Sequence, residues 1–283
     1  MAINLSGQTG TVLDWEWNFN GGAFTSIGNA GLSNITSPAL TSAGTYQFRA
    51  RIQSGVCTPM YSSSATVNVS PISVGGSASA AVATFCSGGS TTVSVSGQTG
   101  SILSWELNAN GAGWVNIGSG GLSTIATGVL SAGTYEYRAI IESAPCASTT
   151  SGIASVTVDV PSVGGSTSAS GTLVCSGDNP TVTLTGNTGT VVYWESQVNG
   201  GGFNNIGNAG SVSISTGALT PGVYDYRAVV QSGTCSPATS SSVSITASSP
   251  SVGGSASAAV AAFCSGGSTT VTLSGQTGNI LSW

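Results

Sequence analysis

The sequence predicts an all-β protein, a tandem array of small antiparallel β-sandwiches stacked end to end. One motif, Gly-Gln-Thr-Gly or Gly-Asn-Thr-Gly, recurs every 89 or 90 residues, and a tryptophan follows each copy eight residues after its first glycine. The copies begin at Gly7, Gly97, Gly186 and Gly275. Such a fixed period is the signature of a repeat architecture. Within each period apolar and polar residues alternate, as in Thr181–Thr185, and no stretch has a helical period.

The repeat boundaries follow from a second motif. Ser-Val-Gly-Gly-Ser occurs at 73–77, 162–166 and 251–255, preceded by a proline. Proline donates no backbone hydrogen bond and glycine orders poorly, so this combination marks a module boundary. We expect an incomplete repeat without its first strand at 1–72, complete repeats at 73–161 and 162–250, and the start of another at 251–283. Because both ends lie inside a repeat and both carry the glycine motif, we expect a segment of a longer protein whose secretion signal lies elsewhere.

The strands of one repeat are expected at 92–96, 101–109, 114–118, 122–127, 134–142 and 152–160. Asn-Gly stands at 20–21, 110–111 and 199–200, between two of these strands in each repeat. This dipeptide adopts the positive φ angles that a tight hairpin needs. Seven or so short strands with frequent turns indicate an antiparallel sandwich.

The composition excludes several functions. Charged residues make up 5% of the chain, whereas about 25% is typical. The net charge is −5, and the only cations are Arg49, Arg51, Arg138 and Arg227. Nucleic acids and anionic membranes require clustered positive charge, so neither is an expected partner. No apolar run is long enough to cross a membrane, so we expect no membrane insertion in this segment.

In the segment Leu130–Ala139, a small residue, a glycine and one variable residue stand directly before Tyr135. The segment recurs at 40–50 and 219–228. It resembles the tyrosine corner of immunoglobulin-like domains. The resemblance implies that the tryptophan after each glycine motif is the buried strand C tryptophan. Where that family has a cysteine two residues after the tyrosine, this chain has an aromatic ring that we expect to pack on the tryptophan. The expected core residues are Trp15, Trp105, Trp194, Tyr46, Tyr135, Tyr224, Phe48, Tyr137 and Tyr226.

The whole repeat resembles a wider group. Two features carry this resemblance: a second cysteine after the tyrosine strand, and the sequence Phe-Cys-Ser-Gly-Gly-Ser-Thr-Thr-Val-Ser-Val near the start of the repeat. Both are similar to immunoglobulin-like tandem repeats of very large secreted Bacteroidota proteins. That group includes the mobile adhesins of gliding motility and other type IX-secreted surface proteins. The resemblance implies an extracellular, cell-surface protein. Its motifs are shared by many such proteins, so the resemblance indicates a class of proteins and not an individual protein.

The six cysteines are separated by gaps that alternate between 29 and 60 residues, and they stand at 57, 86, 146, 175, 235 and 264. Such regular cysteines in a β-rich chain indicate an oxidising compartment. In an immunoglobulin-like sandwich Cys86 and Cys146 would lie at opposite poles, about 30 Å apart, whereas a disulfide needs Cα atoms within about 7 Å. This favours an inter-repeat bond between Cys86 and Cys235. The alternatives are intra-repeat bonds, Cys86 with Cys146 and Cys175 with Cys235, or free thiols.

No catalytic group is expected. The chain lacks His and Lys, and its carboxylates do not recur as close pairs. One glutamate per repeat follows the tryptophan, and one arginine per repeat lies on the neighbouring tyrosine strand with the same outward direction. We therefore expect cross-strand ion pairs Glu106–Arg138 and Glu195–Arg227. No metal or other cofactor is expected, because the cysteines have no zinc spacing and the junctions have no Asp cluster.

These observations favour a structural stalk or filament segment of a very large secreted bacterial surface adhesin, which gives reach and mechanical strength without catalysis. Its expected partners are neighbouring repeats of the same polypeptide, with lateral self-association as a further contact. The alternative is a multivalent array that binds surface polysaccharide. Its candidate platform is Phe24, Trp114 and Phe203, just past the Asn-Gly turns, and these rings could instead cap the sandwich core.

Overall fold

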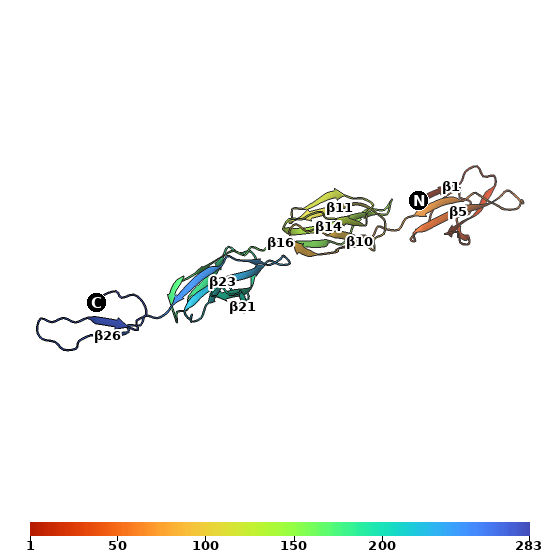
Figure 1. Cartoon of the computed structure of the whole chain (residues 1–283). Helices are drawn as coiled ribbons and strands as arrows, with labels where there is room; N and C mark the ends of the chain where they lie inside the picture. The colour runs from red at the N-terminus through yellow and green to blue at the C-terminus, as the bar shows by residue number, and fades with distance from the viewer. The chain divides into compact units, whose positions relative to one another are not determined.

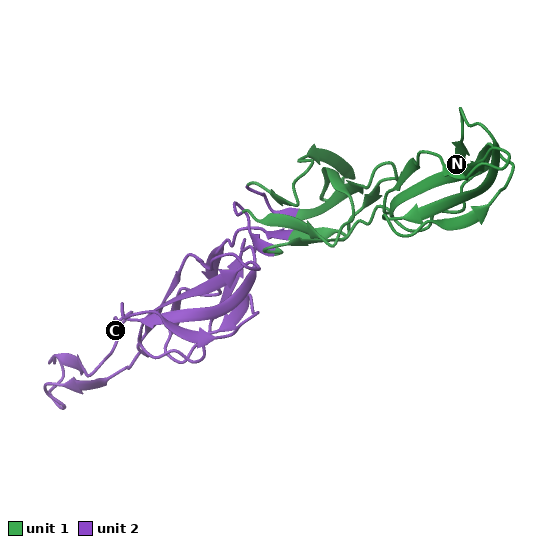
Figure 2. Cartoon of the chain, turned by 90° about the vertical axis from the view of Figure 1, so that its right-hand side faces the viewer, with its two compact units in different colours: residues 1–83, 90–128, 134–156 green, residues 84–89, 129–133, 157–283 purple.

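The computed structural model describes residues 1–283 and contains β-strands but no helix (Figure 1). By its contacts the chain divides into two compact units (Figure 2). Unit 1 comprises residues 1–83, 90–128 and 134–156, and unit 2 comprises residues 84–89, 129–133 and 157–283. The fold is that of tandem β-sandwiches, as the sequence predicts. None of its secondary structure elements is a helix with the length and apolar character to cross a membrane.

The repeat 162–250, which lies wholly in unit 2, shows the architecture of one sandwich. One sheet has the strand order β17-β19-β22, and the other has the order β18-β25-β23-β20-β21, with β24 paired to β23. The strands are β17 (Ser166–Ala169), β18 (Leu173–Cys175), β19 (Thr181–Thr185), β20 (Thr190–Val198), β21 (Asn204–Gly207), β22 (Ser213–Ser215), β23 (Gly222–Gln231), β24 (Ala238–Thr239) and β25 (Val243–Ser248).

The core of this repeat lies between its two sheets. Trp194 and Tyr226 belong to one buried cluster with Val182 and Leu184 of the other sheet. The Trp194 side chain is fully buried, and its indole nitrogen donates a hydrogen bond to the Ser211 carbonyl oxygen at 2.8 Å. A buried indole N–H needs such a partner. Trp15 and Trp105 donate in the same way to Leu32 and Leu122.

The repeat 73–161 has the same succession of strands. Its long central strands, β11 and β14, pair antiparallel with Trp105 opposite Ala139, and β10 lies between β8 and β13. Its strands are β8 (Ser77–Ala80), β9 (Thr84–Cys86), β10 (Thr92–Ser96), β11 (Ser101–Ala109), β12 (Trp114–Gly118), β13 (Thr124–Ala126), β14 (Gly133–Glu142), β15 (Thr149–Thr150) and β16 (Ala154–Asp159).

The first repeat, in unit 1, begins at the strand equivalent to β10. Its strands are β1 (Ala2–Asn4), β2 (Thr11–Phe19), β3 (Thr25–Gly28), β4 (Asn34–Thr36), β5 (Gly44–Gln53), β6 (Met60–Tyr61) and β7 (Ala65–Val69). Trp15, Tyr46 and Phe48 are buried in one cluster. Phe48 stacks on Trp17, at 6.4 Å between ring centroids, because Trp17 is its cross-strand partner. The chain ends with a two-stranded sheet of β26 (Ser255–Ala258) and β27 (Val271–Ser274).

The turns explain two of the recurring motifs. At the Asn-Gly hairpin, Asn199 and Gly200 have φ angles of +50° and +74°, the left-handed values that a two-residue turn requires. The Tyr224 hydroxyl donates to the Thr220 carbonyl oxygen four residues upstream at 3.0 Å, which is the tyrosine corner. Tyr46 makes the same bond to Ser42. Tyr135 and Tyr224 are half-buried rather than fully buried, and the ring of Tyr224 packs against the edge of the core.

Candidate functional site: a disulfide-bonded joint

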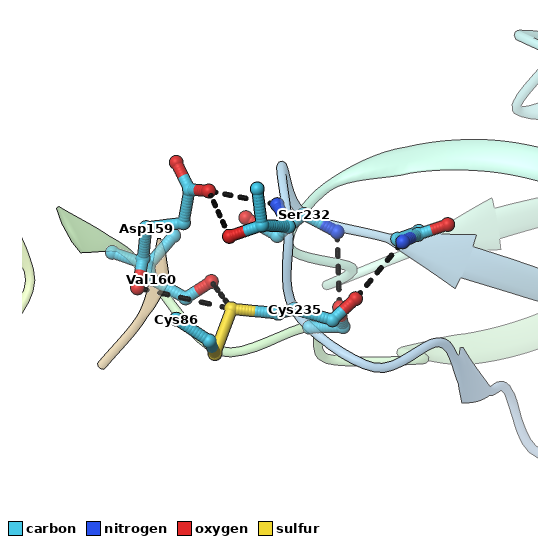
Figure 3. The surroundings of a disulfide bond; sticks show 8 residues. Cys86, Asp159, Val160, Ser232 and Cys235 are labelled. Atoms are coloured by element: carbon cyan, nitrogen blue, oxygen red, sulfur yellow. Dashed lines mark hydrogen bonds between the residues drawn. A yellow bond between two sulfur atoms is a disulfide. The ribbon is translucent and has the colours of Figure 1, made fainter. Parts of the chain in front are cut away.

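A disulfide within unit 2 joins two successive repeats. Cys86 ends β9 of the repeat 73–161, and Cys235 lies in the loop after β23 of the repeat 162–250 (Figure 3). Their Cα atoms are 4.8 Å apart, although the two residues are 149 positions apart in the sequence. The structure therefore has the inter-repeat bond and neither intra-repeat bond. Cys146 and Cys175, the partners in those alternatives, are free.

Parallel strand pairing places Cys86 at the end of its own repeat. β9 pairs parallel with β16, so that Cys86 lies opposite Asp159, and the Ser87 amide donates to the Asp159 carbonyl oxygen at 2.9 Å. The connection to the next repeat begins immediately after Asp159. The sulfur of Cys235 lies 3.2 Å from the Val160 carbonyl oxygen, and Cys235 is only 2% exposed. The disulfide therefore packs directly against the connecting backbone.

Asp159 adds a second, polar contact to this joint. Its Oδ2 accepts hydrogen bonds from the Thr234 amide at 2.7 Å and from the Thr234 hydroxyl at 2.9 Å (Figure 3). These bonds, first the one from the amide and then the one from the hydroxyl, hold the pKa of Asp159 below its ordinary value. Sequence reasoning missed this residue because Ser70 and Ser248 stand at the equivalent positions, so no recurring signal marked it.

The connection between the repeats is held at several points by contacts with the second repeat. The Ser162 hydroxyl oxygen accepts a hydrogen bond from the Ser232 amide at 2.9 Å, and Val163 and Thr188 form a two-residue β-bridge. A Cβ at Gly164 would overlap the carbonyl group of Thr239. The boundary motif therefore needs glycine where two backbone segments approach closely. Thr188, the threonine of the recurring glycine motif, fixes the connection through its bridge to Val163.

The same joint recurs within unit 1, but without its disulfide. The Ser73 hydroxyl oxygen accepts from the Ser143 amide at 2.9 Å, as Ser162 does from Ser232. The Cys146 sulfur lies 3.3 Å from the Pro71 carbonyl oxygen, which matches the contact of Cys235 with Val160. Cys146 is free, and β7 pairs with β5 alone.

Each repeat also carries an ion pair on the outer face of its larger sheet. Glu106 and Arg138 lie opposite each other on β11 and β14, with 2.7 Å between the carboxylate and the guanidinium. Glu195–Arg227 and Glu16–Arg49 form equivalent pairs at 2.6 and 2.8 Å. These partly exposed pairs contribute about 0–1 kcal/mol each.

The candidate sugar platform lies over these ion pairs. The guanidinium of Arg138 stands 4.1 Å from the ring centroid of Trp114, and Arg227 and Arg49 cover Phe203 and Phe24 at 3.8 and 3.6 Å. The rings therefore do not cap the sandwich core. Trp114 is the cross-strand partner of Asn108, which strand alternation places on the same outer face as Glu106. One face of each ring is occupied by arginine, so a sugar could stack only on the other.

Comparison with known proteins gives a family and a set of similar structures. The profile described as "Domain of unknown function (DUF8696)" matches residues 1–71, 74–160 and 163–249, which fall within the expected repeats. None of the curated proteins compared with the chain matches it in sequence. Murine CEACAM1b is 13% identical with a TM-score of 0.36, covering 60% of this chain and 98% of that one. Chicken CNTN1 domains FN1–FN3 are 12% identical with a TM-score of 0.33, covering 84% and 90%. Fibronectin(III)-like modules of Clostridium thermocellum CbhA are 15% identical with a TM-score of 0.31, covering 61% and 94%.

Proposed function

Since the chain belongs to the DUF8696 domain family, with three matched repeats, we propose that it is a stalk segment of a very large secreted bacterial cell-surface adhesin. In this proposal the repeats supply reach and mechanical strength, and the chain performs no catalysis. The observation that carries the proposal is the Cys86–Cys235 disulfide, which bonds one repeat covalently to the next. A module that serves only as a binding unit has no need of such a bond to its neighbour.

The mechanical argument follows from where the bond lies in the chain. Tension applied to the two ends of the chain passes through Cys86, across the disulfide and out through Cys235. The residues 87–234 lie between the two cysteines and are relieved of that tension. A covalent bond resists forces that break hydrogen-bonded strands, so the body of one repeat and most of the next stay folded under load.

The disulfide also supports the proposed location. Disulfides persist in secreted and surface proteins, whereas the bacterial and eukaryotic cytosol keeps thiols reduced. Tandem immunoglobulin-like and fibronectin-like sandwiches fit the same extracellular setting. The more specific assignment to Bacteroidota adhesins, including those of gliding motility, rests on the resemblance of the repeat motifs alone.

The second candidate function is a multivalent carbohydrate-binding array, with one weak site per repeat strengthened by repetition. It is motivated by the aromatic ring that recurs near the Asn-Gly hairpin, at Trp114 and its equivalents. The arginine that covers one face of each ring favours the stalk instead. In the stalk function these rings shield the ion pairs and contact no ligand.

One experiment separates the two functions. Deleting residues 73–161 from the natural protein removes a single repeat and keeps the boundary motifs in phase. A stalk is expected to shorten by one repeat in electron micrographs of the cell surface, with attachment per molecule unchanged. A Trp114→Ala variant is the matched control, and the stalk proposal predicts no effect on attachment. Glycan-array binding that is lost in folded Trp114→Ala protein would overturn the stalk in favour of the binding array.

A further inference from the structure

Each hairpin turn contains a dipeptide that can react with itself. Asparagine directly precedes glycine at only three places in the chain, and these are the turns at 20–21, 110–111 and 199–200. In all three the asparagine and the glycine have positive φ angles and are exposed to solvent. Because glycine has no Cβ, its backbone nitrogen can approach the preceding side chain closely. Each turn therefore places an asparagine carboxamide next to the backbone nitrogen best able to attack it.

The side chain of this asparagine is held by the neighbouring strand. Asn110 Oδ1 accepts a hydrogen bond from the Thr134 amide at 2.9 Å, and the Asn110 amide donates to the Thr134 carbonyl oxygen at 2.7 Å. The two residues thus exchange a pair of bonds, as hydrogen-bonded partners in an antiparallel ladder do. Asn110 contributes its side-chain oxygen to this exchange, directly after the last regular pair of β11 and β14, Ala109 with Tyr135. We call this pair of bonds the asparagine clamp.

The asparagine clamp recurs in the other two repeats. Asn199 Oδ1 accepts from the Val223 amide at 2.9 Å, and the Asn199 amide donates back to the Val223 carbonyl oxygen at 2.8 Å. Asn20 makes the same two bonds with Thr45, at 2.9 and 2.8 Å. The glycine of the tyrosine corner leaves room for the side chain, since a Cβ at Gly222 would lie 3.0 Å from Asn199 Oδ1. The clamp is therefore a feature of the repeat and not of a single turn.

The reaction open to this dipeptide is loss of the side-chain amide, because asparagine is a thermolabile residue. The backbone nitrogen of the glycine attacks Cγ of the asparagine and gives up its proton, the side-chain nitrogen leaves as ammonia, and a succinimide ring forms. Water then adds to one of the two ring carbonyls and breaks its bond to the ring nitrogen. Breaking the bond at Cγ leaves aspartate, whereas breaking the bond at the backbone carbonyl leaves isoaspartate. No electrons are exchanged, and water is the only co-reactant.

The asparagine clamp opposes this reaction in the folded turn. The attacking nitrogen of Gly111 has to approach the face of the Asn110 carboxamide, so the side chain and the following peptide plane have to rotate relative to each other. In the folded turn the bond from the Thr134 amide fixes the side chain, and the bond to the Thr134 carbonyl oxygen fixes the backbone. Ring closure therefore starts from an opened turn, and its rate follows the fraction of time that the turn is open.

We propose that Asn20, Asn110 and Asn199 are modification sites, which convert to aspartate and isoaspartate when their turn opens and are held unreactive by the asparagine clamp in the folded repeat. Each conversion adds one negative charge to a chain whose net charge is −5, so three conversions bring it to −8. Aspartate keeps an oxygen that accepts from the strand amide, so its repeat can fold again. Isoaspartate lengthens the backbone of a two-residue turn that sets the strand register, so its repeat does not regain the hairpin. The proposal does not depend on the stalk function.

The test compares the folded chain with the reduced chain in guanidinium chloride, both incubated in mildly alkaline ¹⁸O-labelled water. The heavy oxygen marks only conversions during the incubation, and mass spectrometry after chymotryptic digestion in ordinary water locates them. We expect conversion at the three sites to be at least about tenfold slower in the folded chain, because two hydrogen bonds have to break first. Asn208 is the matched control, since it is also exposed with a left-handed φ of +62° but precedes alanine. In the denatured chain Asn199 should convert faster than Asn208.

A variant removes one clamp and keeps its Asn-Gly dipeptide. Thr134→Pro deletes the amide that holds Asn110 Oδ1, so Asn110 should lose its protection in otherwise native conditions, while Asn199 stays slow. If proline at this position unfolds the repeat, the wild-type comparison decides by itself. Equal rates in the folded and denatured wild type would overturn the role of the clamp. An Asn199 that converts no faster than Asn208 in the denatured chain would overturn the assignment of the sites.

Discussion

The Cys86–Cys235 bond makes a specific prediction for the length of the fully stretched chain. Replacing Cys86 with serine releases the constraint between two residues that are 149 positions apart. An extended chain spans about 3.3–3.6 Å per residue, whereas the bonded residues are held 4.8 Å apart. The released length is therefore about 500 Å, roughly half of the extended length of the 283-residue chain.

Single-molecule force spectroscopy measures this length directly. The chain is anchored through residues added at both ends and pulled to its limiting extension with and without a reducing agent. The oxidised wild type is expected to reach a contour length about 500 Å shorter than either the reduced wild type or the Cys86→Ser variant. The oxidised wild type should also show fewer unfolding events, because residues 87–234 do not bear the force.

Cys175→Ser is the matched control. It removes a cysteine at the equivalent position of the next repeat, which is free in the structure, so its contour length should equal that of the oxidised wild type. Equal lengths for oxidised wild type and Cys86→Ser would refute the inter-repeat bond. A difference of only about 60 residues of chain would instead indicate the Cys86–Cys146 pairing.

Three further predictions concern the packing and charge of the repeat 162–250 and its joint. Gly164→Ala should destabilise the joint by about 1–3 kcal/mol in chemical denaturation, because its Cβ overlaps the Thr239 carbonyl, whereas Gly202→Ala, with open space around it, should be nearly neutral. Trp194→Phe should cost about 2 kcal/mol, because the Ser211 carbonyl oxygen loses its buried donor, and a loss below 0.5 kcal/mol would contradict that role. The pKa of Asp159 is lower in the folded than in the unfolded state, so its stabilising effect is present above about pH 4 and is lost as the pH falls through the folded pKa. The difference in unfolding midpoint between wild type and Asp159→Asn should therefore narrow below pH 4. A difference that stays the same at every pH would contradict the stabilising role of the Asp159 carboxylate.

The sequence was most informative where the signal recurs in every repeat. The long strands β11 and β14 lie where alternation and the aromatic positions predict them, since each repeat provides an independent copy of the pattern. The expected strand at 122–127 is shorter in the structure, Thr124–Ala126, because Leu122 leaves the strand as its carbonyl accepts the Trp105 bond. The expected strand at 152–160 begins at Ala154, after the separate short strand β15.

Three features that depend on distant partners could not be predicted, although the sequence favours the Cys86–Cys235 bond between residues 149 positions apart. β9 is only three residues long, and its parallel partner β16 lies about 70 residues away, so neither alternation nor a turn marks it. Asp159 is unique to one joint and carries no repeat signal. The stacking of Arg138 on Trp114 depends on side-chain directions across three strands, which strand spacing alone does not determine.

The placement of the arginines has a consequence for proteolysis. All four cationic residues lie within the long strands β5, β14 and β23, and three of them are held by a glutamate and covered by an aromatic ring. Proteases cut most readily at exposed loops, and this chain presents trypsin with no cleavable bond there. Tryptic cleavage after Arg49, Arg138 or Arg227 therefore requires the strand containing it to open. The fragments would show which repeat has unfolded, so the natural sequence carries its own unfolding reporter in each of the three repeats.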